Sequence, residues 1–581
     1  MTRFDRIALV FVALFCAGIL FCPFGYGQYG FRRTSAVQGP KVIKNRPNIV
    51  LFCVDALGFS DLGCYGSEIF TPNLDKLAAE GLRFTQFYNC GQSVSSRASL
   101  LTGQYPQMAG LGHSLDDVRL PGYQGNLNHA APTIAQILQE NGYQTIMTGR
   151  WGLSKYLGEK GPMHSWPNSC GFDQFYGTLA LSGNYFNPLT LMLNELRTSP
   201  TAGEFYLTEA TGNMAATFLD EAAHVEKPIF LYVSLPAPLW PLQAPENELK
   251  SYRNKYASGW DAVRQNRYDN LKTKFLIGPG TQLSDRDAQV CNWSAAGAFQ
   301  AWQSKRMEVY AAQVTAMDRA VGTVMDKMAQ IGRDKDTLYI FVSASGASSD
   351  EIPEDFKDPV YMSEKTRKKV PVLVGNNPKI VPGSERTYQS YGTPWANVSN
   401  TPFRGYARQT YEGSISSPCI VKFPGIKAVG RITHQPAHVI DVLPTILEIL
   451  ELEFPKSVAG VKTIPAVGMS FAPVFQMKTY DRGVLAWEYE GNLALRHDKW
   501  KLVSEWSAEG ESQRAWQLYD LSLDRSETKN LLQQYPSMAK ELFQNYRTWA
   551  KSNQVKTWGE VIDAWQEVER MKAEARGQKR E

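Results

Sequence analysis

Short apolar runs alternate with segments of helical period between residues 46 and about 450. The first run, residues 48–54, is apolar after its leading Asn, which is typical of a strand buried on both faces of a sheet. The pattern predicts strands at 49–54, 82–88, 144–147, 229–234, 338–343, 370–374 and 417–422, and helices at 73–81, 133–141, 212–224 and 306–331. This alternation predicts an α/β domain over residues 46–455, built on a large mixed sheet between layers of helices.

The pattern changes after about residue 455. Residues 484–489, 493–503 and 516–521 alternate as short strands do, and 538–551 has the period of an amphipathic helix. We therefore expect a small antiparallel α+β subdomain at 456–560 and a charged, frayed tail at 561–581. The stretch 238–300 has few periodic segments and is interpreted either as an insertion over one end of the sheet or as a plain surface loop.

The N-terminus has the pattern of a secretory signal peptide. Arg3 and Arg6 precede an apolar run at 7–24, and small residues near 25–27 offer a cleavage point. We expect a signal peptide at 1–27, a linker at 28–45, and export of the mature chain to the periplasm or the extracellular space without a membrane span. An uncleaved membrane anchor is the open alternative, because the run is about long enough to cross a bilayer.

Composition narrows the function classes. The chain has 581 residues, a formal net charge of +4 and no dense block of Lys and Arg, which argues against nucleic-acid binding. Six of the eight cysteines lie beyond the predicted signal peptide, at scattered positions without C-x-x-C spacing, so a zinc site is not expected. An oxidising compartment would permit disulfides, whose pairing the sequence does not define.

Several motifs in family order resemble those of arylsulfatases. They are D-L-G-C-Y-G at 61–66, T-P-N-L-D at 71–75, G-F-D-Q-F-Y-G at 171–177, N-T-P-F-R at 400–404, H-V-I-D at 438–441 with L-P-T at 443–445, and W-Q-L-Y-D-L at 516–521. The resemblance implies an alkaline-phosphatase-like fold and hydrolysis of sulfate esters. It also implies a calcium ion, which would polarise the sulfate, and a formylglycine nucleophile made from Cys or Ser.

The metal positions that this resemblance identifies are largely substituted. The family's first Asp-Asp pair corresponds to Asp55-Ala56, and its later Asp-Asn pair corresponds to Ala344-Ser345. Calcium takes six to eight oxygen ligands, so Asp55 with the Ser345 hydroxyl falls short. Asp55 is therefore interpreted as either the one retained metal ligand or a strand-end carboxylate that caps the following turn.

The positions that carry the reaction are also changed. Ser93 occupies the formylglycine position in S-V-S-S-R. The alternative is that Ser93 carries an ordinary turn or helix N-cap hydroxyl. Arg97 occupies the position of the family's anchoring arginine. Arg150 takes the place of a lysine. Gly152 and Leu239 stand where the family has histidines, and Ala407 stands where it has a lysine. No general acid is evident at these positions.

Three hypotheses follow. The first is an exported sulfatase-family pseudoenzyme that needs no cofactor and binds a sulfated carbohydrate or small sulfate ester through Arg97 and Arg150. The second is a divergent active arylsulfatase that uses Ser93-derived formylglycine and calcium. Its metal ligands would include the displaced carboxylates of Asp350, Glu351 and Glu354. The simpler interpretation of these three residues is a solvated acidic loop. The third is a scaffolding subunit that pairs with an active relative.

Overall fold

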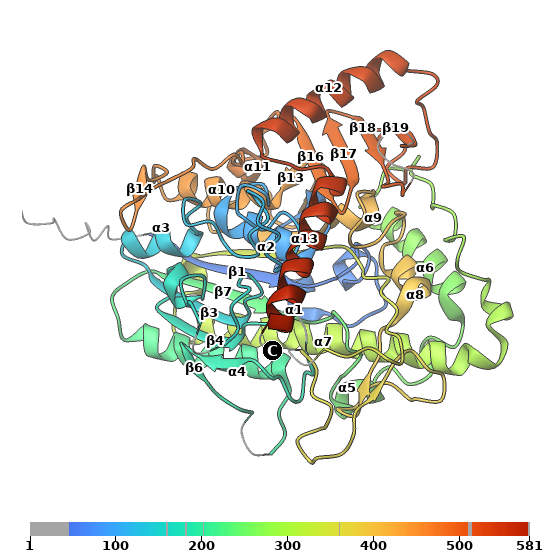
Figure 1. Ribbon diagram of the computed structural model, residues 1–581, viewed down its shortest axis with the longest axis horizontal. Helices are drawn as coiled ribbons and strands as arrows, with labels where there is room; N and C mark the ends of the chain where they lie inside the picture. Colours follow the sequence, from blue (N-terminus) through green and yellow to red (C-terminus); the bar gives the residue numbers. More distant parts are fainter. Residues whose placement is uncertain are drawn as a thin grey trace, which may run out of the picture. The chain divides into compact units, whose positions relative to one another are not determined.

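The computed structural model describes residues 46–158, 161–180, 183–200, 203–358, 361–508 and 514–578, which lie in one compact unit at 42–581 (Figure 1). The predicted signal peptide and linker, 1–27 and 28–45, fall outside the described residues. Within the described part, no helix combines the length and hydropathy that a membrane span requires. The six cysteines described there are free thiols.

A large mixed sheet forms the centre of the described unit and confirms the predicted α/β class. Its order is β12-β2-β11-β8-β1-β7-β3-β4-β5-β6, with β13 paired to β2, and β8, β1, β7, β3 and β4 run parallel. The strand bounds are β1 Asn48–Val54, β2 Leu82–Tyr88, β3 Gln144–Arg150, β4 Gln174–Thr178, β5 Leu191–Leu193, β6 Leu196–Arg197, β7 Ile229–Leu235, β8 Thr337–Ser343, β11 Ser416–Lys422, β12 Arg431–Thr433 and β13 Ala437–His438.

Helices cover both faces of this sheet, because alternate side chains of each central strand point to opposite sides. In β1, Val50 and Phe52 pack with α1, α4 and α7, whereas Ile49 and Leu51 pack with α2, α3 and α10. The bounds are α1 Pro72–Glu80, α2 Ser93–Thr102, α3 Ile134–Glu140, α4 Leu207–Ala223, α7 Gln300–Gln330 and α10 Val442–Ile449. Burial on both faces explains why these strands are apolar along their length.

A four-stranded antiparallel sheet with helix α12 follows near the C-terminus, as predicted (Figure 1). The stretch predicted as one strand at 493–503 is a hairpin, in which Asp498 adopts a φ of 52° at the turn. The predicted frayed tail is instead helical through Gln578. The bounds are β16 Leu485–Tyr489, β17 Asn492–His497, β18 Trp500–Ser504, β19 Trp516–Asp520, α12 Pro536–Ser552 and α13 Trp558–Gln578.

The connecting segments hold more regular structure than the sequence indicated. The stretch 238–300 contains α5 Glu246–Lys250, α6 Gly259–Thr273 and η3 Trp293–Phe299. The strand predicted at 370–374 shrinks to β9 Leu373–Val374, which pairs with β10 Thr387–Tyr388 apart from the main sheet. The other elements are η1 Gly63–Tyr65, η2 Asn168–Cys170, η4 Asp334–Asp336, α8 Gly392–Ser399, α9 Glu412–Ile415, η5 Val439–Asp441, β14 Ser457–Val458, β15 Val461–Lys462 and α11 Ala472–Phe475.

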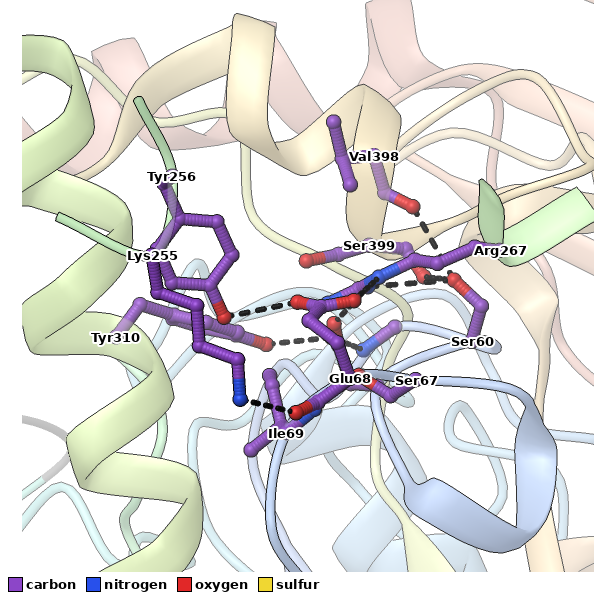
Figure 2. Close-up of polar contacts among 12 residues, drawn as sticks. Ser60, Ser67, Glu68, Ile69, Lys255, Tyr256, Arg267, Tyr310, Val398 and Ser399 are labelled. Atoms are coloured by element: carbon purple, nitrogen blue, oxygen red, sulfur yellow. Dashed lines mark hydrogen bonds and ion pairs between the residues drawn. The ribbon is translucent and has the colours of Figure 1, made fainter. Parts of the chain in front are cut away.

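A buried ionic network joins α6 to the loop that follows β1 (Figure 2). The Arg267 guanidinium pairs with Asp61 at 2.6 Å and with Glu68 at 2.9 Å, and the Tyr256 hydroxyl donates to Glu68 at 2.8 Å. Tyr310 of α7 donates to Asp61 at 2.7 Å. Arg267 and Asp61 are fully buried, and Arg267 is the counter-charge that the Asp61 carboxylate requires. The insertion therefore fixes the path of the chain directly after β1.

Replacing Arg267 by Met should lower the free energy of unfolding by about 3–5 kcal/mol, because Asp61 would remain buried without its counter-charge. The measurement is chemical denaturation followed by circular dichroism. Arg286→Met is the matched control, since Arg286 pairs with Asp261 at 2.7 Å where both side chains are partly exposed, and should cost less than about 1 kcal/mol. Equal effects of the two substitutions would contradict a structural role for the network.

Candidate active site

Three neighbouring strands end at one edge of the central sheet, and their terminal residues form the candidate site. Asp55 follows β1, Ser234 lies near the end of β7, and Arg150 ends β3. β7 pairs in parallel with both β1 and β3, so their carboxyl ends meet at the same edge. Helix α2, which contains Ser93 and Arg97, begins beside them and brings its first turn to Asp55. The structure thus brings four predicted site residues together.

The Asp55 carboxylate accepts bonds from three side chains. Its Oδ1 accepts from Ser93 Oγ at 2.7 Å and lies 2.9 Å from Arg97 Nη2, and its Oδ2 accepts from Arg150 Nη1. Asp55 and Arg97 are fully buried, and the Arg150 side chain is 3% exposed. Both oxygens of the strand-end carboxylate are therefore held by groups of the chain itself.

Two residues that the sequence analysis missed hold Arg97 in place. Arg97 Nη1 donates to the Ser234 hydroxyl and, at 3.3 Å, to the Tyr232 hydroxyl. Ser234 could have been found as a polar residue near the end of a predicted strand. Tyr232 could not have been identified in this way, because in the sequence it is one residue of the apolar run that forms β7. Arg97 is consequently enclosed, and it does not offer the exposed guanidinium that the binding hypothesis requires.

Burial and charge act in opposite directions on the two arginines. Burial lowers the pKa of the Arg97 guanidinium, but the adjacent Asp55 carboxylate raises it, and the resulting pKa lies above the ordinary value. For Arg150, burial has the stronger effect, and its pKa lies below the ordinary value despite Asp55. Both groups are cationic at neutral pH, because the guanidinium of arginine is not deprotonated in proteins.

The alternatives predicted for Ser93 and Asp55 are wrong. Ser93 is the first residue of α2, and the N-cap is Gln92, whose side chain accepts from the amides of Val94 and Ser95. Asp55 does not cap a turn; Asp61 has that role, since its carboxylate accepts from the Gly58 amide at 2.8 Å. Ser93 and Asp55 bond to each other instead, because the start of α2 lies directly against the end of β1.

The residues at the family's calcium positions do not fit a calcium ion. Ala56 and Ala344 have no side-chain oxygen, and the Asp55 carboxylate is already paired with two guanidinium groups. Among the residues that the structure describes, the Ser345 hydroxyl is therefore the one unpaired candidate at these four positions. Calcium requires six to eight oxygens. Within the described residues, no three His, Cys, Asp or Glu side chains are grouped so that they could hold a metal ion.

The acidic residues proposed as displaced ligands have other partners. Asp350 accepts from Trp240 Nε1 at 2.8 Å, Glu351 pairs with Arg306 at 3.1 Å, and Glu354 accepts from Asn377 at 3.1 Å. They belong to a segment that is partly exposed to solvent. These contacts are those of an acidic loop held by its neighbours, which is the simpler of the two interpretations.

The positions expected to carry protons hold no titratable group. Gly152 adopts a φ of 66° and its amide donates to the Leu179 carbonyl at 3.2 Å. Leu239 lines a small cavity beside Arg150, and the amide of Ala407 donates to the Ala347 carbonyl at 3.0 Å. None of the three side chains can donate a proton to a leaving group.

Sequence comparisons identify the family. The Sulfatase family model matches residues 47–452, and a second model, N-sulphoglucosamine sulphohydrolase, C-terminal, matches residues 406–552. The chain belongs to the sulfatase family. An uncharacterized sulfatase of Schizosaccharomyces pombe is 30% identical over 88% of this chain and 95% of its own length. The arylsulfatase of Klebsiella aerogenes is 30% identical over 76% of this chain and 94% of its own length.

Solved structures share the fold of this sulfatase-family chain. Ps i-CgsB in complex with k-i-k-neocarrahexaose superposes with a TM-score of 0.61 at 23% identity, covering 88% of this chain and 94% of that one. BT4656 in complex with its substrate D-glucosamine-2-N,6-O-disulfate gives a TM-score of 0.59 at 19% identity, covering 88% and 98%. At this level of identity the similarity establishes the fold, which is alkaline-phosphatase-like. It does not establish the reaction, which depends on the site residues.

Calcium should not stabilise this protein, because its candidate site lacks the oxygen ligands. We expect the thermal unfolding midpoint to be the same in millimolar calcium and in EGTA at fixed ionic strength. A real site with a Kd a hundredfold below the calcium concentration would add about 2.7 kcal/mol to the free energy of unfolding. Calcium-dependent stabilisation that is lost in Asp55→Asn would contradict our assignment of the site.

Proposed function

We propose that this sulfatase-family protein is exported and does not hydrolyse sulfate esters by the formylglycine and calcium mechanism. The observation that carries the proposal is the pairing of Asp55 with both Arg97 and Arg150. In that arrangement the carboxylate that would hold a divalent cation serves as the counter-ion of two buried guanidinium groups. The internal arginines thus occupy the electrostatic role that a cation would have at the end of β1.

Sulfate-ester hydrolysis requires three functions that this site does not supply together. A Lewis acid must polarise the sulfate, a nucleophile must attack sulfur, and an acid must protonate the leaving oxygen. The Lewis acid lacks ligands, and the acid that would protonate the leaving oxygen is missing because Gly152, Leu239 and Ala407 carry no titratable group. Ser93 alone remains at a reacting position, and its hydroxyl donates to Asp55 at 2.7 Å.

We further propose that the protein binds a sulfated carbohydrate at the rim of the former substrate cleft. The rim consists of Trp240, Asp350 and Arg408: Trp240 donates to Asp350 at 2.8 Å, and Arg408 lies 3.7 Å from the same carboxylate. Trp240 and Arg150 line one cavity, which places the rim beside the site, and the Arg408 side chain is 53% exposed. An aromatic ring with an exposed guanidinium suits a sugar that carries sulfate.

The divergent active arylsulfatase stays the alternative, and one observation favours it. Ser93 Oγ and Asp55 lie at the distance at which a nucleophile contacts a base, 2.7 Å. Hydrolysis would then depend on conversion of Ser93 to formylglycine and on release of Asp55 from Arg150. Both requirements can be tested on the intact protein.

Purified protein from its native host should show no turnover of an aryl sulfate above background, with or without calcium. Mass spectrometry of the peptide that contains Ser93 should show an unmodified serine. Ser93→Ala serves as the control, because it removes the residue without altering the arginine pairs of Asp55. Turnover that requires a metal and disappears in Ser93→Ala would overturn the proposed function.

Titration calorimetry should detect binding of a sulfated oligosaccharide without its hydrolysis. Trp240→Ala and Arg408→Ala are each expected to weaken binding about tenfold, which corresponds to about 1.4 kcal/mol. Arg286→Met, a partly exposed arginine of the stretch 238–300, should leave the affinity unchanged. Equal affinity for the desulfated oligosaccharide, or no effect of the two rim substitutions, would refute binding at the rim.

A further inference from the structure

The buried cluster at the end of β1 carries an unbalanced charge. Arg97 and Arg150 each contribute one positive charge, and Asp55 contributes one negative charge. In the described part of the chain, Asp55 is the one carboxylate within 4.0 Å of either guanidinium group. The cluster therefore holds a net charge of one positive unit, although its three side chains are at most 3% exposed. Burying an uncompensated charge is strongly unfavourable, so the fold needs a further anion here.

A cavity lies where that anion is needed. Its volume is about 20 Å³, and it is lined by Arg150 together with Thr178, Tyr185, Thr190, Leu239 and Trp240. The Nε–H group of Arg150 is buried and has no hydrogen-bond partner within the described residues. A water-sized group needs at least roughly 10–15 Å³, so the cavity is large enough to hold a small ion.

Thr190 supplies a second donor at the cavity wall. Its Oγ1 accepts from the amide of Ala180 at 3.1 Å, so its own hydroxyl proton can serve an acceptor in the cavity. The hydroxyl of Tyr185, by contrast, donates to the Leu239 carbonyl at 2.8 Å. The remaining wall is largely apolar, through Leu239 and the ring of Trp240. A charged donor, a hydroxyl and apolar surface favour a small, weakly hydrated anion over water.

We propose that this cavity binds one halide-sized monovalent anion, such as chloride, as the second counter-ion of the Arg97–Arg150 pair. The proposed ligand is a single ion held beside Arg150, so it differs from the carbohydrate proposed for the rim. The proposal rests on the same pairing of Asp55 that carries the proposed function, but its test involves no hydrolysis. If no halide binds, the proposal on hydrolysis is unaffected. If the protein hydrolyses sulfate esters, the proposal on halide binding is unaffected.

The test is thermal unfolding at fixed ionic strength, in which sodium chloride or bromide replaces sodium gluconate. Once the halide concentration exceeds its Kd, each further tenfold increase should favour the folded state about tenfold, or about 1.4 kcal/mol. Arg150→Met should abolish this dependence, because Asp55 and Arg97 then balance each other. Thr190→Val should weaken halide binding while it leaves the charge unchanged. Arg286→Met, the control, should respond as the wild type does.

A bromide-soaked crystal provides an independent readout, since an anomalous peak is expected in the cavity beside the Arg150 side chain in the wild type and not in Arg150→Met. If Arg150→Met does not fold, Thr190→Val and the bromide peak still decide the question. Unfolding that is insensitive to halide in the wild type, together with no bromide peak in the cavity, would overturn the proposal. Halide stabilisation of equal size in Arg150→Met would overturn it as well.

Discussion

One buried carboxylate determines the arrangement of the site. Asp55 ends the central strand β1, where water cannot reach it, so its charge must be met by the protein. Arg97 reaches it from α2 and Arg150 from β3, while Ser234 and Tyr232 of β7 hold the far side of Arg97. Asp55 thus joins β1 to α2 and β3, and Arg97 extends the contact to β7. Any function of this edge of the sheet has to operate around that ion pair.

The fold was predictable because its signals are local. Strands β1, β2, β7 and β8 are buried on one or both faces, so their runs of apolar residues stand out at nearly the observed bounds. The hairpin of β17 and β18 was not resolved into two strands, because its turn at Asp498 lies between residues that continue the alternation. Helix α13 was missed because a charged amphipathic segment reads as a solvated tail until the surface that covers its apolar stripe is known.

Four of the site residues were predictable from the sequence, but their contacts were not. The positions of Asp55, Ser93, Arg97 and Arg150 follow from motifs, and the structure brings all four together. Their partners depend on side chains that approach from other elements, and sequence patterns do not carry that information. Asp55 was therefore interpreted as a cap or a metal ligand, whereas two guanidinium groups bind both of its oxygens. The hypothesis that Arg97 and Arg150 bind a sulfated ligand meets the same difficulty, since Arg97 is fully enclosed by other side chains.

The backbone turn after β1 is held by contacts from outside the site. Ala56 adopts a φ of 55°, a left-handed conformation that costs roughly 1–2 kcal/mol for a residue with a Cβ. Its carbonyl accepts from the Tyr310 hydroxyl at 3.3 Å, and the same hydroxyl contacts Asp61, the partner of Arg267. The ionic network of Figure 2 thus holds the turn after β1 from outside the site. Under the proposed function, a scaffold that fixes this turn from outside the site lets arginine side chains take the place of a divalent cation while the family's fold is kept.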